Sequence, residues 1–246
     1  MARKIYDMAF ADQEKAVPPN QPLNLFREST LNKYHVDTAK GMGEKFEKYI
    51  EGICGAIWSA VNTWTSTATI QGVMIFGPVA TGGMVVGPPL TPLILSQGPM
   101  TTPMELRYTT AIATAIGNGW LTWQSSIKVP GLPWYPAFAA FPAPVAPPMP
   151  NIPMPLVTLV SVDASLAPGA LKGMMMGTFG DPTALHAADL FDAVSQAFNS
   201  VFMMYKLSTI VKNVLGTGPI PTFAPPIVPV GPVVGGIGTG LPGCFT

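Results

Sequence analysis

A run of prolines places the strongest limit on what this chain can fold into. Residues 129–156, VPGLPWYPAFAAFPAPVAPPMPNIPMPL, hold ten prolines in 28 positions and no charged side chain. Proline fixes φ and lacks an N–H donor, which excludes a helix or a central strand here. Trp134, Tyr135 and Phe138 also make the run too apolar for a solvated linker. We therefore expect it to lie extended against a hydrophobic surface.

The proline run belongs to a repeated pattern. A shift of 59 residues aligns 41 columns without a gap and with eleven identities, among them Trp64 with Trp123 and Pro88-Pro89 with Pro147-Pro148. Similarity at a fixed period indicates duplication. A further shift of 78 residues places Pro225-Pro226 on Pro147-Pro148, a weaker match that leaves two or three tandem modules open.

Each module is predicted to be an amphipathic helix followed by an extended apolar arm. Apolar residues recur at three- and four-residue steps from about Thr38 or Gly43 to Ser66, from Thr102 to Ile127, and from Asp181 to about Leu215, as on one helix face. The arms would cover residues 70–95, 129–156 and 219–234. We therefore expect an α+β fold with much irregular structure.

Local signals predict several element boundaries. Thr102-Pro103-Met104-Glu105 has the pattern of a capping box with proline in the first helical turn. Asp181-Pro182 predicts the start of the third helix by the same reasoning. Residues 156–162, LVTLVSV, are the best strand candidate, and the Gly/Met-rich residues 164–180 are predicted to be a loop.

These boundaries divide the chain into five parts. They are a charged N-terminal arm (1–40), module 1 (41–100), module 2 (101–162), a Gly/Met-rich connection (163–180) and a divergent module 3 (181–246). The N-terminal arm shows no sustained period. Its residues Leu23, Leu25 and Phe26 are predicted to anchor it to a partner.

Charge is unevenly distributed. Residues 1–51 hold 16 of the 26 charged side chains, and no charge occurs in 52–104 or in 213–246. Charged residues make up 11% of the chain, against about 25% in ordinary globular proteins. A surface this poor in charge would leave large apolar patches exposed, so we expect neighbours to cover it. Because the net charge is zero, nucleic acid is not an expected partner.

A lipid membrane is less favoured than neighbouring proteins as the partner of this apolar surface. The best candidate span, Ile70–Val86, contains Pro78 and several glycines and is shorter than about 20 apolar residues. The N-terminus, MARKIYDMAFADQEK, has no hydrophobic core of a signal peptide, which predicts synthesis in the cytoplasm. A membrane-active, holin-like or pore-associated protein that inserts its apolar arms stays open as the alternative.

Candidate chemistry is sparse. His186 lies near Asp181, Asp189 and Asp192, but acidic residues are also favoured in the first turn of a helix. The glycines of residues 236–240 resemble a phosphate loop, yet no helix can follow them. We therefore predict no catalytic residue, metal or cofactor. An enzyme with a site between modules is a third, less favoured interpretation.

In general character, residues 45–246 resemble accessory baseplate and spike proteins of contractile phage tails and phage-like injection systems. In those particles, small Gly/Pro-rich proteins cap or wrap a threefold spike. The resemblance implies a non-enzymatic structural subunit that assembles into a virion or phage-tail-like particle. Its partners would be other protein subunits, with a trimeric spike or hub as one candidate. The interaction residues would be Trp64, Trp123, Pro88, Pro89, Pro147, Pro148, Pro225, Pro226, Leu23, Leu25 and Phe26.

Overall fold

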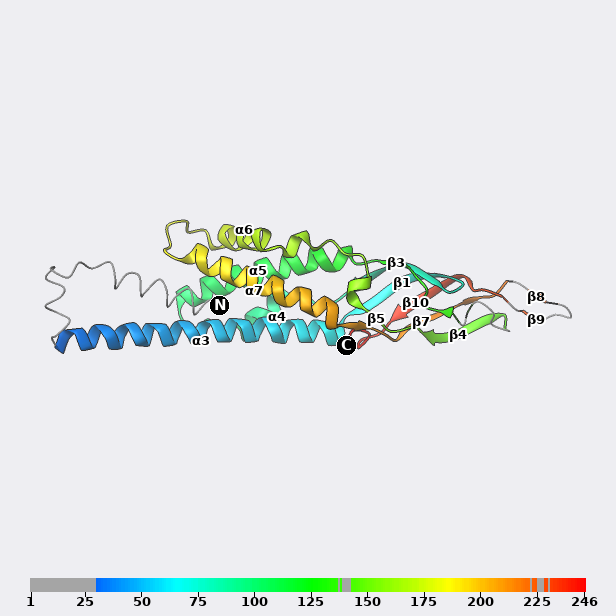
Figure 1. The fold of residues 1–246 in the computed structure, drawn as a ribbon, viewed down its shortest axis with the longest axis horizontal. Helices are drawn as coiled ribbons and strands as arrows, with labels where there is room; N and C mark the ends of the chain where they lie inside the picture. Colours follow the sequence, from blue (N-terminus) through cyan, green and yellow to red (C-terminus); the bar gives the residue numbers. More distant parts are fainter. Residues whose placement is uncertain (1–29, 137, 139–142, 222, 225–227, 230) are drawn as a thin grey trace.

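Three long helices each pass directly into a β-strand, and this connection organises the fold (Figure 1). The connected pairs are α3 (Thr30–Thr67) with β1 (Thr69–Phe76), α5 (Pro103–Ser126) with β3 (Val129–Leu132), and α7 (Ala187–Ser208) with β6 (Ile210–Val211). The three helices therefore run in the same direction, and their C-terminal ends lie beside the strands.

The structure, a computed structural model, describes residues 30–246 except 137, 139–142, 222, 225–227 and 230. Side chains are described from residue 40 onward, except those of 137, 139–142 and 222–230. Within this part, five α-helices occupy one end of an elongated molecule, and a six-stranded antiparallel sheet occupies the other (Figure 1). The predicted α+β class is confirmed.

Helices α3 and α5 follow their sequence patterns closely. Tyr49, Ile53 and Trp64 are buried on the face of α3 that meets α4 (Leu90–Gln97) and α5. The Thr102 side chain accepts a hydrogen bond from the Glu105 backbone N–H, and the Glu105 carboxylate accepts one from Thr102 N–H, which confirms the capping box. However, α3 begins at Thr30, so residues 30–40 belong to the helix and not to an irregular arm.

The first two predicted arms supply strands of one shared sheet. Its order is β3-β2-β1-β10-β7-β4, with β2 at Val79–Val86, β4 at Val145–Pro150, β7 at Val214–Pro219 and β10 at Val234–Gly240. The proline-rich run supplies both edge strands, β3 and β4, where a missing N–H donor can face solvent. Its exclusion from the central strands is therefore confirmed, and the division of the chain into two or three modules stays a prediction.

Aromatic side chains of the proline-rich run pack against the inner face of this sheet. Trp134, Tyr135 and Phe138 are buried, and the Tyr135 hydroxyl donates to the Val214 carbonyl oxygen at 2.8 Å. A Cβ at Gly216 would lie 2.8 Å from the Tyr135 ring, so glycine makes room for the ring. The run thus lies on a hydrophobic surface as predicted, but that surface belongs to the same chain and not to a neighbouring subunit.

Two short pairings complete the strands. β5 (Met154–Pro155) pairs with β6, and β8 (Phe223–Ala224) pairs with β9 (Val228–Pro229) at the far tip of the molecule (Figure 1). The turn of the first hairpin lies at Gly77-Pro78, between β1 and β2. Gly82 and Gly83 lie within β2 with positive φ angles.

Residues 156–180 contain helical segments where a strand and a loop were predicted. Leu156–Thr158 is a 3₁₀ helix (η2), and Leu156 and Leu159 are both buried at a three-residue spacing. A second 3₁₀ helix (η3, Asp163–Leu166) precedes α6 (Pro168–Phe179). In α6 the buried residues Leu171, Met175 and Phe179 recur every four positions. The glycines between them, which suggested a loop, lie on its open side.

The start of α7 also differs from its prediction. Asp181 does not begin the helix, because its carboxylate accepts hydrogen bonds from the backbone N–H and hydroxyl of Thr183 and forms a local turn. These hydrogen bonds lower the pKa of Asp181. The helix starts at Ala187 and ends at Ser208, because the chain must turn there to enter β6.

Candidate functional site: an apolar groove between helices

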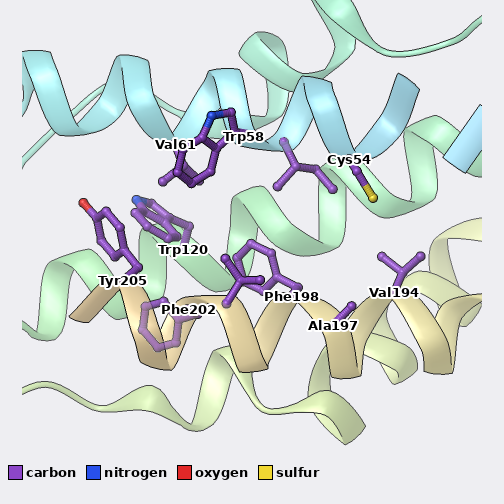
Figure 2. A pocket seen from close by; sticks show the side chains of 11 residues that line it. Cys54, Trp58, Val61, Trp120, Val194, Ala197, Phe198, Phe202 and Tyr205 are labelled. Carbon is purple, nitrogen blue, oxygen red and sulfur yellow. The ribbon is translucent and has the colours of Figure 1, made fainter. Parts of the chain in front are cut away.

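An open groove lies between α3 and α7, with α5 as its floor (Figure 2). Its volume is about 290 Å³. Cys54, Trp58 and Val61 of α3 face the Val194, Phe198 and Tyr205 side of α7, and Trp120 of α5 lies between them (Figure 2). The lining residues are Cys54, Ile57, Trp58, Val61, Trp120, Val194, Ala197, Phe198, Val201, Phe202 and Tyr205.

Helix geometry explains why these side chains form two parallel walls. On α3 the lining positions 54, 57, 58 and 61 follow the i, i+3, i+4, i+7 spacing of one helix face. On α7 the lining positions from 194 to 205 follow the same spacing. Helix α3 packs on α4 and α5, whereas α7 packs on α6. The lining segments of α3 and α7 are therefore separated from each other. A hydrogen bond of 2.8 Å between the Thr65 and Tyr205 hydroxyls joins them at the end near the sheet.

The groove is apolar and open to solvent. Trp58 is 57% exposed and Val201 is 52% exposed on its rim. None of the lining residues carries a charge. Burial raises the pKa of Tyr205 to about 12 and also raises the pKa of the Cys54 thiol. Both groups are therefore neutral at pH 7, and the groove offers an uncharged surface for apolar contact.

The two cysteines are expected to react differently. Cys54 is exposed in the groove, whereas Cys244 is buried and its pKa is raised by burial to about 11. In the folded protein, a maleimide should therefore label Cys54 alone, and the rate should increase as the pH rises toward the raised pKa of this thiol. Mass spectrometry after brief labelling checks this, with guanidinium-unfolded protein as the control in which both thiols react. Labelling of Cys244 at an equal rate in the folded protein would contradict this packing.

The floor of the groove is the upper surface of an aromatic cluster. Trp120 contacts Trp64 and Trp123, with ring centroids 5.1 Å and 4.6 Å apart. Phe202, a second lining residue, packs against Trp123 at 5.0 Å, and Phe245 near the C-terminus packs against Trp64 at 5.3 Å. The cluster joins α3, α5, α7 and the chain end, so it holds the two walls at a fixed spacing.

No protein-family model, curated protein or solved structure matches this chain.

The interaction residues predicted from the sequence lie in different places. Trp64 and Trp123 are fully buried, each three residues before the end of its helix, so they support the groove without being exposed in it. Pro88 and Pro89 connect β2 to α4, whereas Pro147 and Pro148 lie in edge strand β4. The remaining predicted residues, Pro225, Pro226, Leu23, Leu25 and Phe26, lie outside the described residues.

The described residues contain neither a metal-binding cluster nor a membrane-spanning helix. Among the described residues, no cluster of three or more His, Cys, Asp and Glu side chains could hold a metal ion. His186 Nδ1 lies 3.4 Å from the Asp189 carboxylate in an exposed pair at the start of α7. Within the same part of the chain, no helix has both the length and the apolar character needed to cross a bilayer.

The groove itself was not predicted, although its α7 wall was. The apolar period indicates a stripe along one side of α7, formed by Leu190, Val194, Ala197/Phe198, Val201 and Met204/Tyr205. Of this stripe Val194 is buried, whereas Val201 is 52% and Met204 is 69% exposed. Periodicity therefore identified residues that share a face of α7. Among the described residues, none covers Val201 on that face.

Proposed function

We propose that this chain is a non-enzymatic structural subunit of a large protein particle. The observation that carries the proposal is the open, uncharged groove between α3 and α7. An exposed tryptophan beside other exposed apolar side chains is typical of a protein–protein contact centre. The lining side chains include no charged group that could act in acid–base chemistry or hold a metal, which favours binding over catalysis.

The partner that best fits the groove is an amphipathic α-helix of a neighbouring subunit. Two parallel walls with helical spacing present alternating ridges and gaps, into which the side chains of a third helix can pack. The walls have no charge from Gly52 onward on α3 or from Ala193 to Tyr205 on α7. The face of the partner helix that enters must therefore be apolar, since a buried unpaired charge would be costly.

The particle that we propose is the baseplate or spike of a contractile phage tail or phage-like injection system. The resemblance of residues 45–246 in general character supports this choice. The Gly/Pro-rich strands at the narrow end of the elongated molecule also support it (Figure 1). Three helices that each enter a strand also favour a chain of three modules. Such a chain could match a trimeric spike or hub with one copy per trimer.

Co-sedimentation tests the proposal. The tagged chain is expressed in the organism that encodes it, large particles are pelleted, and the pelleted proteins are identified and quantified. We expect the chain in the pellet at a fixed ratio to the subunits of one particle. Val201→Glu places a charge on the groove rim, and it should lower the amount of the chain in the pellet by at least about tenfold.

A matched variant controls for surface charge alone. Met203→Glu alters an exposed residue of the same helix that does not line the groove, so it should pellet like the unchanged chain. If the unchanged chain stays in the low-mass fraction, the structural-subunit proposal is wrong. If it pellets and Val201→Glu pellets equally well, the groove is not the contact.

A further inference from the structure

The outer face of the sheet, opposite Tyr135, is a second apolar surface. The residues that alternate with the buried ones along β1, β2 and β10 point away from the core. They include the polar Gln71, Thr81 and Thr239 and seven apolar residues that are between 37% and 58% exposed. The apolar residues are Met74, Phe76, Val79, Met84, Val86, Val234 and Ile237. We call this surface the outer face.

Strand register places Met74, Phe76, Val79, Val234 and Ile237 side by side, whereas Met84 pairs with the polar Gln71. Met74 of β1 pairs with Ile237 of β10, and Phe76 of β1 pairs with both Val234 of β10 and Val79 of β2. Directly paired residues of antiparallel strands project to the same side. The central strands β1 and β10 therefore carry the middle of the patch, and β2 carries its flank.

The outer face has the relief needed to pack against an identical face. Met74, Phe76 and Ile237 protrude, whereas Gly72 and Gly235 on the same face leave open space where a Cβ would stand. Since protruding and recessed positions occur together, the protruding side chains of one copy can enter the recesses of another after a twofold rotation. The strands that carry the face contain no charged residue, and the Lys128 ammonium beside β2 donates to the Gly83 carbonyl oxygen at 2.8 Å.

The available area and the sheet edges also favour a face-to-face contact. An exposed apolar patch of about 300–600 Å² is typical of an interaction site, and a standard interface buries ~800 Å² per partner. Seven apolar side chains that are each 37–58% exposed form a patch of this order. Prolines occupy both edge strands, with Pro130 in β3 and Pro147 in β4. Addition of a further strand at either edge is therefore disfavoured.

From these observations, we propose that the outer face binds a second copy of this chain. The two sheets stack face to face at about 10 Å, the ordinary separation of packed sheets. Met74, Phe76 and Ile237 of each copy form the centre of the contact. This homodimer is independent of the α3–α7 groove, which stays free for a different subunit.

Sedimentation of the purified full-length chain tests the dimer. At micromolar concentration we expect the mass of two 25.9 kDa chains. Met74→Lys and Ile237→Lys each place a charge at the centre of the contact and should weaken the dimer by at least about 100-fold, giving monomers. Met104→Lys is the control, because Met104 is similarly exposed at 46% but lies on α5. It should remain a dimer.

Circular dichroism and thermal unfolding establish that each variant is folded, and a folded monomer of either outer-face variant supports the proposal. Val201→Glu in the groove should leave the dimer intact, so a failure of the groove contact is distinguishable from a failure here. An unchanged chain that sediments as a monomer overturns the second-copy proposal. If that monomer instead binds phosphatidylcholine vesicles and Ile237→Lys abolishes the binding, lipid is the occupant. Retention of the dimer by both folded outer-face variants also overturns it.

Discussion

Replacing Trp64 with alanine is expected to lower the free energy of unfolding by about 3–5 kcal/mol. Trp64 is fully buried at the point where α3 meets the sheet, and its ring contacts Trp120, Trp123 and Phe245. Its removal leaves a large cavity. It also leaves the buried Gln124 side chain without the indole N–H that it accepts, which adds a desolvation cost.

Guanidinium unfolding monitored by circular dichroism measures this loss. Trp58→Ala is the matched control, because Trp58 lies on the same helix but is 57% exposed, and it should cost less than about 1 kcal/mol. Trp123→Ala should resemble Trp64→Ala, since Trp123 is equally buried in the same cluster. Equal stabilities for the Trp64 and Trp58 variants would show that the cluster is not the packed centre of the molecule.

Replacing Asp163 with alanine should destabilise the chain by about 2–4 kcal/mol. Lys206 is 6% exposed, and its Nζ donates to the Asp163 carboxylate at 2.7 Å and to the Ser161 hydroxyl at 3.0 Å. Without Asp163, the ammonium group would be buried with no counter-charge. The Asp163 side chain is partly exposed, so solvent screens the ion pair and the expected loss of stability is smaller than for a fully buried pair.

A second substitution separates the buried charge from other effects. In the double variant Asp163→Ala/Lys206→Met the ammonium group is gone, and methionine can fill its volume next to the Phe202 ring. We expect the double variant to recover at least half of the stability lost in Asp163→Ala. Unfolding by urea gives both values. A double variant that is less stable than the single one would mean that Lys206 has a role beyond pairing with Asp163.

Short-range signals in the sequence predicted their structures well. Thr102 and Glu105 are three residues apart, so the capping box depends on nothing outside one turn. The apolar stripe of α5 was correct for the same reason, because its proline and threonine boundary and its period lie within one segment. Asp181-Pro182 shows the limit of this reasoning, since an aspartate before a proline can also accept hydrogen bonds in a turn, as it does here.

The sheet could not be predicted because its pairings join distant parts of the chain. Ile70 in β1 pairs with Gly240 in β10, which is far along the sequence. The strand glycines Gly216 and Gly238 leave room for Tyr135, which packs against their backbone in the folded chain. A single sequence does not distinguish a glycine in a strand from a glycine in a loop. The strands of this sheet were therefore predicted only as extended arms.

The candidate site was hidden for a different reason. Helical periodicity shows which residues share a face, but it does not show what covers that face. Val194 and Val201 lie on one stripe of α7, yet the first is buried and the second is exposed. Only the spacing of α3 and α7 in three dimensions distinguishes them.

The common direction of α3, α5 and α7 has an electrostatic consequence. Each helix has a partial negative charge of about half a unit at its C-terminal end, and the three ends lie beside the sheet. Lys206 stands in the last turn of α7, and Lys128 follows the end of α5. Two of the few cations after Gly52 are therefore placed where they offset helix dipoles, and the apolar groove and outer face are left without charge.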